Sequence, residues 1–504
     1  MKKLLCLLLS LLMLLPVFVS CKDDAKNPAG TTGSDESSSG IQPTEDDRFA
    51  GTNFHGQTLN IQNSNGQATL TMATSNIYIE GEEELTGDAA LDSVIRRNQS
   101  VEEYLNVDLV FYPVDIIYNE VPAELRQLVL SGDRTYQVII NDIWGCVPMT
   151  AEGIFRNIYT EGAVFDFNEP WWYDDFMTDI SLDVNKRYTL AGDFFIDQLR
   201  NTECLIMNKS YYEDLYGDPN DVYQTVLDQK WTIDAYNQLV ANAFFDLDGD
   251  GDAGPNDRYV SIGSDEWGCC IPWLIAGDPG FITRDEDGFP VIAIDNDNAY
   301  TLVDLLRATY RSAFFCNSIS KDDSEQVAST MFTSGQGLFL WGNRLGSLET
   351  DVIRKADDDI AVLPYPKRDD SQKDYVTSIH DTTEMGFIPV TVTDEEMPFV
   401  STVLEVLCRE TNRQVLPVYY ESSLKIKYTR DKLSGQMIDI IHDHYGNGFA
   451  LAWSDCLNDI FMEKTLYPCV AEDSPKLASK IKSQMKAANA KLKKLIEQTE
   501  KLYD

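Results

Sequence analysis

Two periods of hydrophobic spacing alternate in the first part of the folded chain. Residues 59–63, 107–112 and 136–140 are rich in apolar and β-branched side chains, which predicts three short strands. Between them, apolar positions recur every three to four residues over 91–105 and 123–130, which predicts two helices. The order strand, helix, strand, helix, strand predicts a parallel α/β sheet built with right-handed crossovers.

Beyond Gly145 the pattern starts again with different elements. Strands are predicted over 187–190, 203–207, 258–262, 291–294, 337–341 and 360–363, and helices over 231–244, 299–313, 394–409 and 432–443. A last long helix follows Ser474 and Pro475, a pair typical of a cap and first helical turn. A chain of 504 residues is long enough for two or three domains of ordinary size.

Residues 1–20 have the pattern of a secretory signal peptide. Lys2 and Lys3 precede an apolar run over 4–19, and Ser20 is a small residue before the expected cut. A membrane-spanning anchor is the alternative, but crossing a bilayer takes about 20 apolar residues. The run is shorter than that, so the protein is expected to work outside the cytoplasmic membrane.

Cys21 directly follows the small residue, which resembles the lipobox of bacterial lipoproteins. The resemblance implies that its thiol is lipidated and anchors the mature chain to the outer face of the cytoplasmic membrane. Phe18 stands where a lipobox usually has leucine, and simple secretion is the alternative. Residues 21–55 are mostly small and polar, which predicts a flexible tether between the lipid anchor and the folded part.

The charge of the chain limits its partners. There are 82 acidic and 41 basic side chains, for a formal net charge of −41. Such an acidic surface repels nucleic acid, anionic lipid headgroups and polyphosphate substrates, so membrane contact is expected through the anchor only. Neutral solutes and divalent cations remain as ligands.

Eight cysteines follow Cys21. In an exported chain they could form a disulfide framework, whose connectivity the sequence does not give. Most of them lie in apolar stretches, where thiols commonly pack as small hydrophobic groups. No Cys-x-x-Cys pair is present, so a zinc cluster is not expected, and we favour mostly reduced, buried thiols.

Residues 246–257 have the spacing of an EF-hand calcium loop. The side chains of Asp246, Asp248 and Asp250 occupy positions 1, 3 and 5, Gly251 supplies the turn, the Asp252 carbonyl stands at position 7, and Asp257 stands at position 12. Asp257 is one methylene shorter than the usual glutamate, and a strand is expected after it in place of a helix. The spacing predicts half an EF-hand, with calcium as a structural cofactor. An acidic turn without metal is the alternative.

Catalytic motifs are not apparent in the sequence. H-E-x-x-H, G-x-S-x-G and Walker patterns are missing. His442 and His444 end a predicted helix, and an i, i+2 pair does not share a helical face. Glycoside hydrolysis needs only two carboxylates at a set separation, so an acid pair stays open as an alternative.

Several distinctive segments follow one another over about residues 57–470. They are residues 91–107, 130–139, Pro170-Trp171-Trp172, 186–193, 207–209, 230–234, 332–341 and 360–367. In this order they resemble extracellular solute-binding proteins of ABC importers, most of all the family 1 sugar-binding lipoproteins of the maltose-binding type from Gram-positive gut bacteria. The resemblance implies an α/β, two-lobe fold of the periplasmic-binding-protein (type II) kind, with a hinge and a cleft between the lobes.

The resemblance also implies a division of the chain. After the signal peptide (1–20) and tether (21–55) come lobe 1 (56–145), lobe 2 with the calcium-type loop (146–362), a return segment of lobe 1 (363–415), and a return to lobe 2 with the C-terminal helices (416–504). It implies capture of a carbohydrate, expected to be an oligosaccharide, by a monomer that delivers it to the transmembrane permease subunits. A surface enzyme acting on glycosides, a surface adhesion module and a peptide ligand are the alternatives.

Ligand-binding candidates come from two arguments. Asp142 and Trp144 fall just past the predicted strand 136–140, and ligands of parallel sheets bind beyond the carboxyl ends of strands. The resemblance adds Trp341, in the cleft-facing stretch of lobe 2, and Asp193, which closes a Tyr-x-x-x-Gly-Asp turn that faces the ligand in relatives. Predicted loop position adds Trp267, Arg344 and Asp381. For each, a purely structural role is the alternative.

Overall fold

The computed structural model describes residues 40–41, 44, 47–64, 76–116, 119–241, 245–247, 249–251, 257–263, 266–310, 315–316, 324–349, 353, 356, 358–425, 432–471 and 476–502. The predicted signal peptide, Cys21 and most of the predicted tether lie outside these residues, as do Asp248 and Asp252. In this described part of the chain, no helix is both long and apolar enough to cross a membrane.

The first sheet contains the predicted parallel unit. Its strands are β1 (Gln57–Ser64), β2 (Val107–Val114), β3 (Val138–Asp142), β4 (Thr189–Leu190) and β12 (Glu384–Phe387), in the order β2-β1-β3-β12-β4. β1 pairs in parallel with both β2 and β3, as the sequence predicts. Between β1 and β2 runs α3 (Ala89–Leu105), whose N-terminus is capped by the Asp88 carboxylate, and α4 (Val121–Leu130) leads into β3.

The antiparallel part of this sheet is not predicted from the sequence. β12 pairs antiparallel with β3 and with β4, although it comes from a distant part of the chain. Glu384 lies opposite Asp142 and Phe387 lies opposite Ile139. The segment before β12 therefore arrives at the carboxyl end of β3, and the segment after β12 leaves at the opposite edge of the sheet.

The second sheet is mixed. Its strands are β5 (Glu203–Asn208), β6 (Tyr259–Gly263), β9 (Phe315–Cys316), β10 (Gly337–Arg344) and β11 (Ile360–Leu363), in the order β11-β5-β10-β6-β9. β10 runs parallel to β6 and antiparallel to β5. A separate hairpin pairs β7 (Ile282–Arg284) with β8 (Pro290–Ile292).

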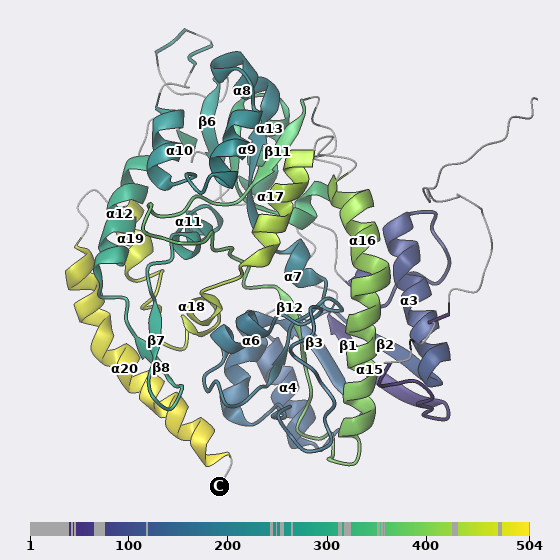
Figure 1. Cartoon of the computed structure of the whole chain (residues 1–504). Coiled ribbons are helices and arrows are strands. Elements are labelled where there is room, and N and C mark those ends of the chain that lie inside the picture. The colour runs from purple at the N-terminus through teal and green to yellow at the C-terminus, as the bar shows by residue number, and fades with distance from the viewer. Residues whose placement is uncertain are drawn as a thin grey trace, which may run out of the picture. The chain divides into compact units, whose positions relative to one another are not determined.

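Helices surround both sheets. Those not yet named are α2 (Asn76–Ile79), α5 (Ile143–Cys146), η1 (Val147–Glu152), α6 (Asp174–Ile180), α7 (Asp197–Arg200), α8 (Lys209–Tyr216), α9 (Asn220–Leu227), α10 (Ile233–Val240), α11 (Glu266–Ala276), α12 (Asp297–Tyr310), α13 (Ser324–Thr333), η2 (Leu345–Glu349), α15 (Met397–Glu410), η3 (Thr411–Val415), α16 (Leu416–Tyr419), η4 (Tyr420–Lys425), α17 (Lys432–Asp443), α18 (Gly448–Trp453), α19 (Leu466–Ala471) and α20 (Leu477–Lys501). Figure 1 shows α8, α9 and α10 around the second sheet, and α4 and α6 beside the first.

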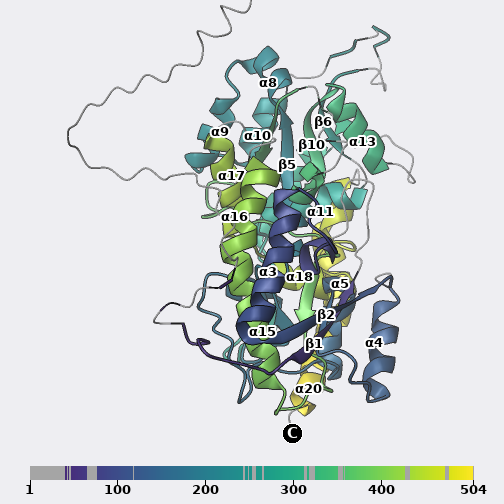
Figure 2. The same ribbon diagram turned by 90° about the vertical axis from the view of Figure 1, so that its right-hand side faces the viewer.

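Several segments of the chain cross between the two sheets. Residues 191–202 connect β4 to β5, and residues 364–383 connect β11 to β12. A third crossing leads from α15 to α17, because α15 packs on α3 and α17 packs on β11. Figure 2 shows α15 and α16 in line beside α3. The first change of sheet thus falls at 191–202, not at the predicted boundary 145–146, because β4 pairs with β12 in the first sheet.

The later boundaries follow the strands more closely. β11 ends at Leu363, where the return to lobe 1 is predicted. Within the predicted lobe 2 return, however, α18 packs on α5 and α6 beside the first sheet, whereas α19 packs on α11 and α12 beside the second. Residues 454–465 therefore form another connection between the two sets of elements. The buried thiols Cys146, Cys204, Cys270 and Cys408 form no disulfide.

Candidate functional site

A pocket of about 170 Å³ lies at the carboxyl end of β3. It is lined by Trp144, Asp381, Leu451, Ser454, Asp455, Asp459, Met462 and Glu463. Trp144 and Asp381 are both predicted site residues, and the amide of Trp144 donates to the carbonyl of Asp381 over 3.1 Å. The antiparallel pairing of β12 with β3 brings these two residues together, since Asp381 lies just before β12.

Asp142 supports this pocket from within the sheet. It is 6% exposed and caps α5, where its carboxylate accepts from the Gly145 amide at 2.6 Å. Burial, with the nearby charge of Asp381, raises the pKa of Asp142 to about 7 despite that hydrogen bond. Asp381 itself lies 3.1 Å from Nδ1 of His380. Asp142 therefore lies behind the pocket, close enough to Asp381 for the two charges to interact.

The other wall of the pocket is the connection that follows α18. Its backbone turns sharply, with Asn458 and Asp459 both at positive φ (67° and 53°). The amide of Asp459 donates to the Ser454 carbonyl at 2.7 Å, which closes the turn. The carboxylate of Asp459 in turn lies 2.7 Å from Nζ of Lys464. Asp455 and Asp459 of this turn, and Glu463 after it, line the pocket together with Trp144.

These wall residues are missed by the sequence reasoning. Ser454, Asp455, Asp459 and Glu463 stand in a stretch without strand or helix periodicity, and acids are common throughout this chain. The available signal is the spacing of Asp455, Asp459 and Glu463 every four residues directly after the apolar stretch 449–453. Only the packing of α18 against α5 shows that the stretch faces Trp144.

Asp193 lies in the first crossing, away from the lining of this pocket. It is 1% exposed and accepts hydrogen bonds from the Tyr173 hydroxyl (2.7 Å) and the Asn412 amide (2.8 Å). Burial raises its pKa to about 7, against those two donors. The Tyr173 hydroxyl also lies 3.3 Å from Nε2 of the partly exposed His442. Asp193 thereby joins the first and third crossings and the end of α17.

The crossings at 191–202 and 364–383 are also hydrogen-bonded to one another. The Glu203 amide donates to the Ser378 carbonyl (2.9 Å), and the His380 amide donates to the Asn201 carbonyl (3.1 Å). Arg344, a predicted site residue at the end of β10, reaches the same place, since its guanidinium donates to the Asn201 side chain at 3.3 Å. The structure thus places Arg344 against the first crossing, partly exposed and outside the lining of the pocket beyond β3.

Trp341 is placed in the core of the second sheet. It is 2% exposed, its indole NH donates to the Tyr236 hydroxyl at 2.9 Å, and its ring lies 4.8 Å from that of Trp273. A sugar ring has no exposed face of Trp341 to stack on in this conformation, which favours the packing alternative. Trp267 lies in α11, and its side chain falls outside what the structure describes.

The calcium-type loop is described in part. The Asp246 carboxylate accepts from the amides of Gly249 (2.6 Å) and Gly251 (2.9 Å), and Phe245 pairs with Arg258 at the base of the loop. Asp257 is fully buried and accepts from the Leu247 amide at 2.9 Å. Among the described residues, no group of three or more His, Cys, Asp or Glu is arranged to hold a metal ion, and two of the predicted ligands lie outside them.

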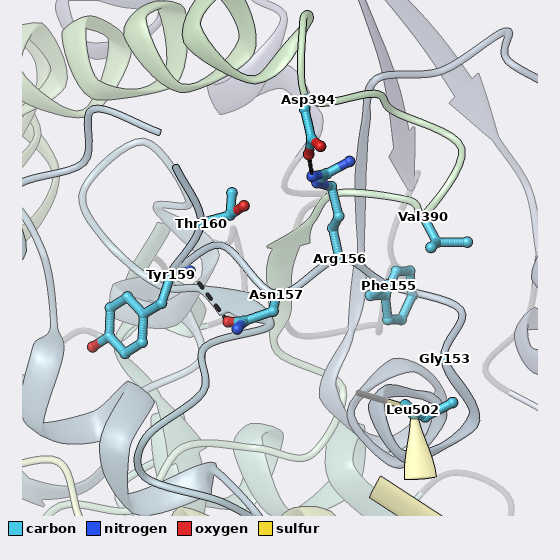
Figure 3. Close-up of a pocket in the computed structure, with 9 residues that line it drawn as sticks. All are labelled: Gly153, Phe155, Arg156, Asn157, Tyr159, Thr160, Val390, Asp394 and Leu502. Atoms are coloured by element: carbon cyan, nitrogen blue, oxygen red, sulfur yellow. Dashed lines mark hydrogen bonds and ion pairs between the residues drawn. The ribbon is translucent and has the colours of Figure 1, made fainter. Parts of the chain in front are cut away.

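A larger cavity of about 580 Å³ lies far from these strand ends (Figure 3). It is lined by residues 153–160 and 390–394 and by Leu502 near the C-terminus of the chain. Because β12 runs antiparallel to β3, Val390 lies at the edge of the first sheet opposite Asp142. The lining of this larger cavity includes one acidic side chain, Asp394, which pairs with Arg156. We take the pocket beyond β3 as the candidate site because it brings together Trp144 and Asp381, two of the predicted residues.

Solved structures share this architecture. A cyclo/maltodextrin-binding protein, crystallised with maltotetraose, matches with a TM-score of 0.56 at 12% identity, over 87% of this chain and 97% of its own. An uncharacterized protein from Listeria monocytogenes also matches with a TM-score of 0.56 at 12% identity, over 86% and 100%. No family model matches the chain, and no curated protein matches its sequence. The predicted α/β fold of the periplasmic-binding-protein type is confirmed.

Proposed function

We propose that the protein is an extracytoplasmic solute-binding protein of an ABC importer, which captures a carbohydrate by hinge closure and delivers it to the permease. The observation that carries the proposal is the pocket beyond β3, where an aromatic ring and several carboxylates meet in a two-lobe fold. The fold neighbour crystallised with maltotetraose supports a carbohydrate ligand. Binding followed by release needs no covalent step, so the proposed protein is not an enzyme.

The chemistry of the pocket suits a sugar. The face of an indole such as Trp144 covers the apolar face of a pyranose ring, and carboxylates such as Asp381 and Asp455 accept hydrogen bonds from its hydroxyl groups. The buried Ser454 hydroxyl can donate or accept as the ligand requires. An aromatic platform with a few convergent polar groups is the usual design of a small-molecule site.

The crossings supply the means of closure. The chain passes between the sheets at 191–202, at 364–383, between α15 and α17, and at 454–465. Residues 454–465 also form a wall of the pocket, so movement of the second sheet against the first would change its width. Hinge closure around a ligand follows from such a connection.

A ligand panel tests this function. Thermal unfolding is followed with and without mono- and oligosaccharides, and the same mixtures are analysed for products. One saccharide is expected to raise the melting temperature without being consumed, because a ligand that binds only the folded state stabilises it. Product formation would instead support a glycoside-active enzyme. Binding of polymers alone, or of peptides alone, would also contradict the proposal.

The anchor is a separate part of the proposal. A lipid on Cys21 would hold the protein near its permease, and the acidic surface would keep it from binding anionic lipids elsewhere. In Cys21→Ser the protein is expected to move from the membrane fraction to the medium, with unchanged ligand binding. Retention of this variant in the membrane fraction would contradict lipidation at this residue.

Calcium in the 246–257 loop is likewise proposed. The described residues fit the ion, since two backbone amides hold the Asp246 carboxylate in place and the buried Asp257 carboxylate favours a nearby cation. Bound calcium would join the two ends of the loop. Chelation is therefore expected to lower the melting temperature by several degrees, and added calcium to restore it. An Asp246→Asn variant should lose this response, and an unaltered melting temperature on chelation would contradict the site.

A further inference from the structure

The charges around the pocket beyond β3 are unbalanced. Its described lining contains four carboxylates and no basic side chain. The chain as a whole carries a net charge of −41, so acids by themselves are expected anywhere on its surface. These four line one cavity together with Trp144, where a ligand would exclude water from them.

An ammonium group lies beside these acids. Nζ of Lys464 lies 2.7 Å from Asp459, and the lysine side chain is 47% exposed. The hydrogen bond with Asp459, with the charges of Asp459, Asp455 and Glu463, raises the pKa of Lys464. Asp381, on the opposite wall, pairs with His380, which is charged only when protonated.

Ser454 is a second, independent sign of a ligand. It is 8% exposed and lines the pocket, and its hydroxyl has no hydrogen-bond partner among the described residues. Buried hydroxyl groups nearly always have a partner, because leaving one without a partner is unfavourable. A ligand group that enters the pocket would supply this partner.

We propose that the solute recognised at this pocket is a cationic carbohydrate, an amino sugar with a free, protonated amine. The inference rests on the proposed function and narrows its ligand class. The amine would lie among Asp455, Asp459 and Glu463, where charge-assisted hydrogen bonds are stronger than those to neutral hydroxyls. The sugar ring would pack on Trp144, whose face also attracts a nearby cation.

The other cation to consider is a metal ion. A divalent ion needs several oxygen ligands at one point. Among the described residues, no three acids or histidines are arranged in that way. The volume of about 170 Å³ is small beside the 300–1,000 Å³ of typical ligand pockets, which suits a single sugar ring with its amine.

The test compares two disaccharides that differ in the charge of their amines and in the acetyl groups on them, and the salt dependence separates the effect of the charge from that of size. Calorimetric affinities are measured for a glucosamine disaccharide and for the same disaccharide with both amines acetylated, at low and at high salt. The free amine is expected to bind about 10- to 100-fold more tightly at low salt, the range given by a charge-assisted hydrogen bond. This preference should shrink at high salt, because screening shortens the reach of exposed charges.

Variants locate the preference. Asp455→Asn with Glu463→Gln changes two exposed side chains, so folding should be retained, which circular dichroism and the melting temperature check. These changes are expected to reduce the preference for the amine at least 10-fold, whereas Asp221→Asn, on the exposed face of α9, should leave it unchanged. Equal affinity for the two disaccharides would overturn the cationic ligand and leave the proposed function standing. If neither these probes nor any other saccharide binds, the proposed function fails as well.

Discussion

Replacing Glu349 by alanine is expected to lower the free energy of unfolding by about 3–5 kcal/mol, one of the larger losses that a single change can cause here. Glu349 is the last residue of η2, which directly follows β10 of the second sheet. Its carboxylate lies 3.2 Å from the guanidinium of Arg200 in the first crossing. The side chain of Arg200 is 0% exposed. Removal of Glu349 would take away the closer of two carboxylates that pair with this guanidinium and leave Asp197 at 3.6 Å.

The loss extends beyond the ion pair. The hydroxyl of Tyr78 donates to Glu349 at 3.2 Å, and the hydroxyl of Tyr419 donates to its other oxygen. Both hydroxyls would lose their acceptor, and a buried donor left without a partner costs about 1–3 kcal/mol. Glu349→Gln replaces the carboxylate with an uncharged amide of the same shape, which can still accept one hydrogen bond. An intermediate loss of stability is therefore expected.

Urea unfolding of the two variants measures this effect. The matched control is Glu152→Ala, which breaks the ion pair with Arg126, whose side chains are 44% and 40% exposed. An exposed pair contributes about 0–1 kcal/mol, so the control should lose little. If Glu349→Ala and Glu152→Ala lose the same stability, the buried cluster around Glu349 contributes no more than an exposed ion pair.

Truncating two tryptophans is expected to separate binding from stability. Trp341→Ala should lower the free energy of unfolding by about 3–5 kcal/mol, because the ring is 2% exposed and packs against Trp273 and Tyr236. Trp144→Ala removes a partly exposed ring at the pocket, so stability should change less and affinity for the saccharide should fall at least 10-fold.

Calorimetric titration and urea unfolding of both variants check this contrast. Phe399 is a buried residue of α15 outside the lining of the pocket, so Phe399→Leu is a control for loss of stability without loss of affinity. If Trp341→Ala remains as stable as the parent and no longer binds, the cleft role implied by family likeness is correct. If Trp144→Ala binds normally, the pocket beyond β3 is not the ligand site.

The sequence predicts the parallel part of the fold because local signals agree there. β1, α3, β2, α4 and β3 each have a clear hydrophobic period, and their alternation allows few topologies. β12 has no comparable signal, since it is short and includes Glu384 and Gly386. Its place beside β3 depends on tertiary packing, and so does the first change of sheet at 191–202.

The candidate site shows the same division. Asp142 and Trp144 follow a predicted strand, so the rule for parallel sheets is enough to mark them. Trp144 and Asp381 lie together only because β12 pairs antiparallel with β3, which the sequence does not predict. Trp341 lies in β10, a central strand between β5 and β6 that is buried on both faces. Such strands show no alternation, so the sequence does not tell a cleft-facing residue from a core residue there.

The third crossing has a mechanical consequence. α15, η3, α16 and η4 follow one another without a break from Met397 to Lys425, and η3 and η4 are π-helical. A loop takes up rotation in a few backbone dihedrals, whereas a continuous rod resists torsion along its length. Twisting would concentrate in the wider π turns, which are local irregularities of a helix. The rod would therefore store elastic energy when the sheets rotate, and return it when they relax.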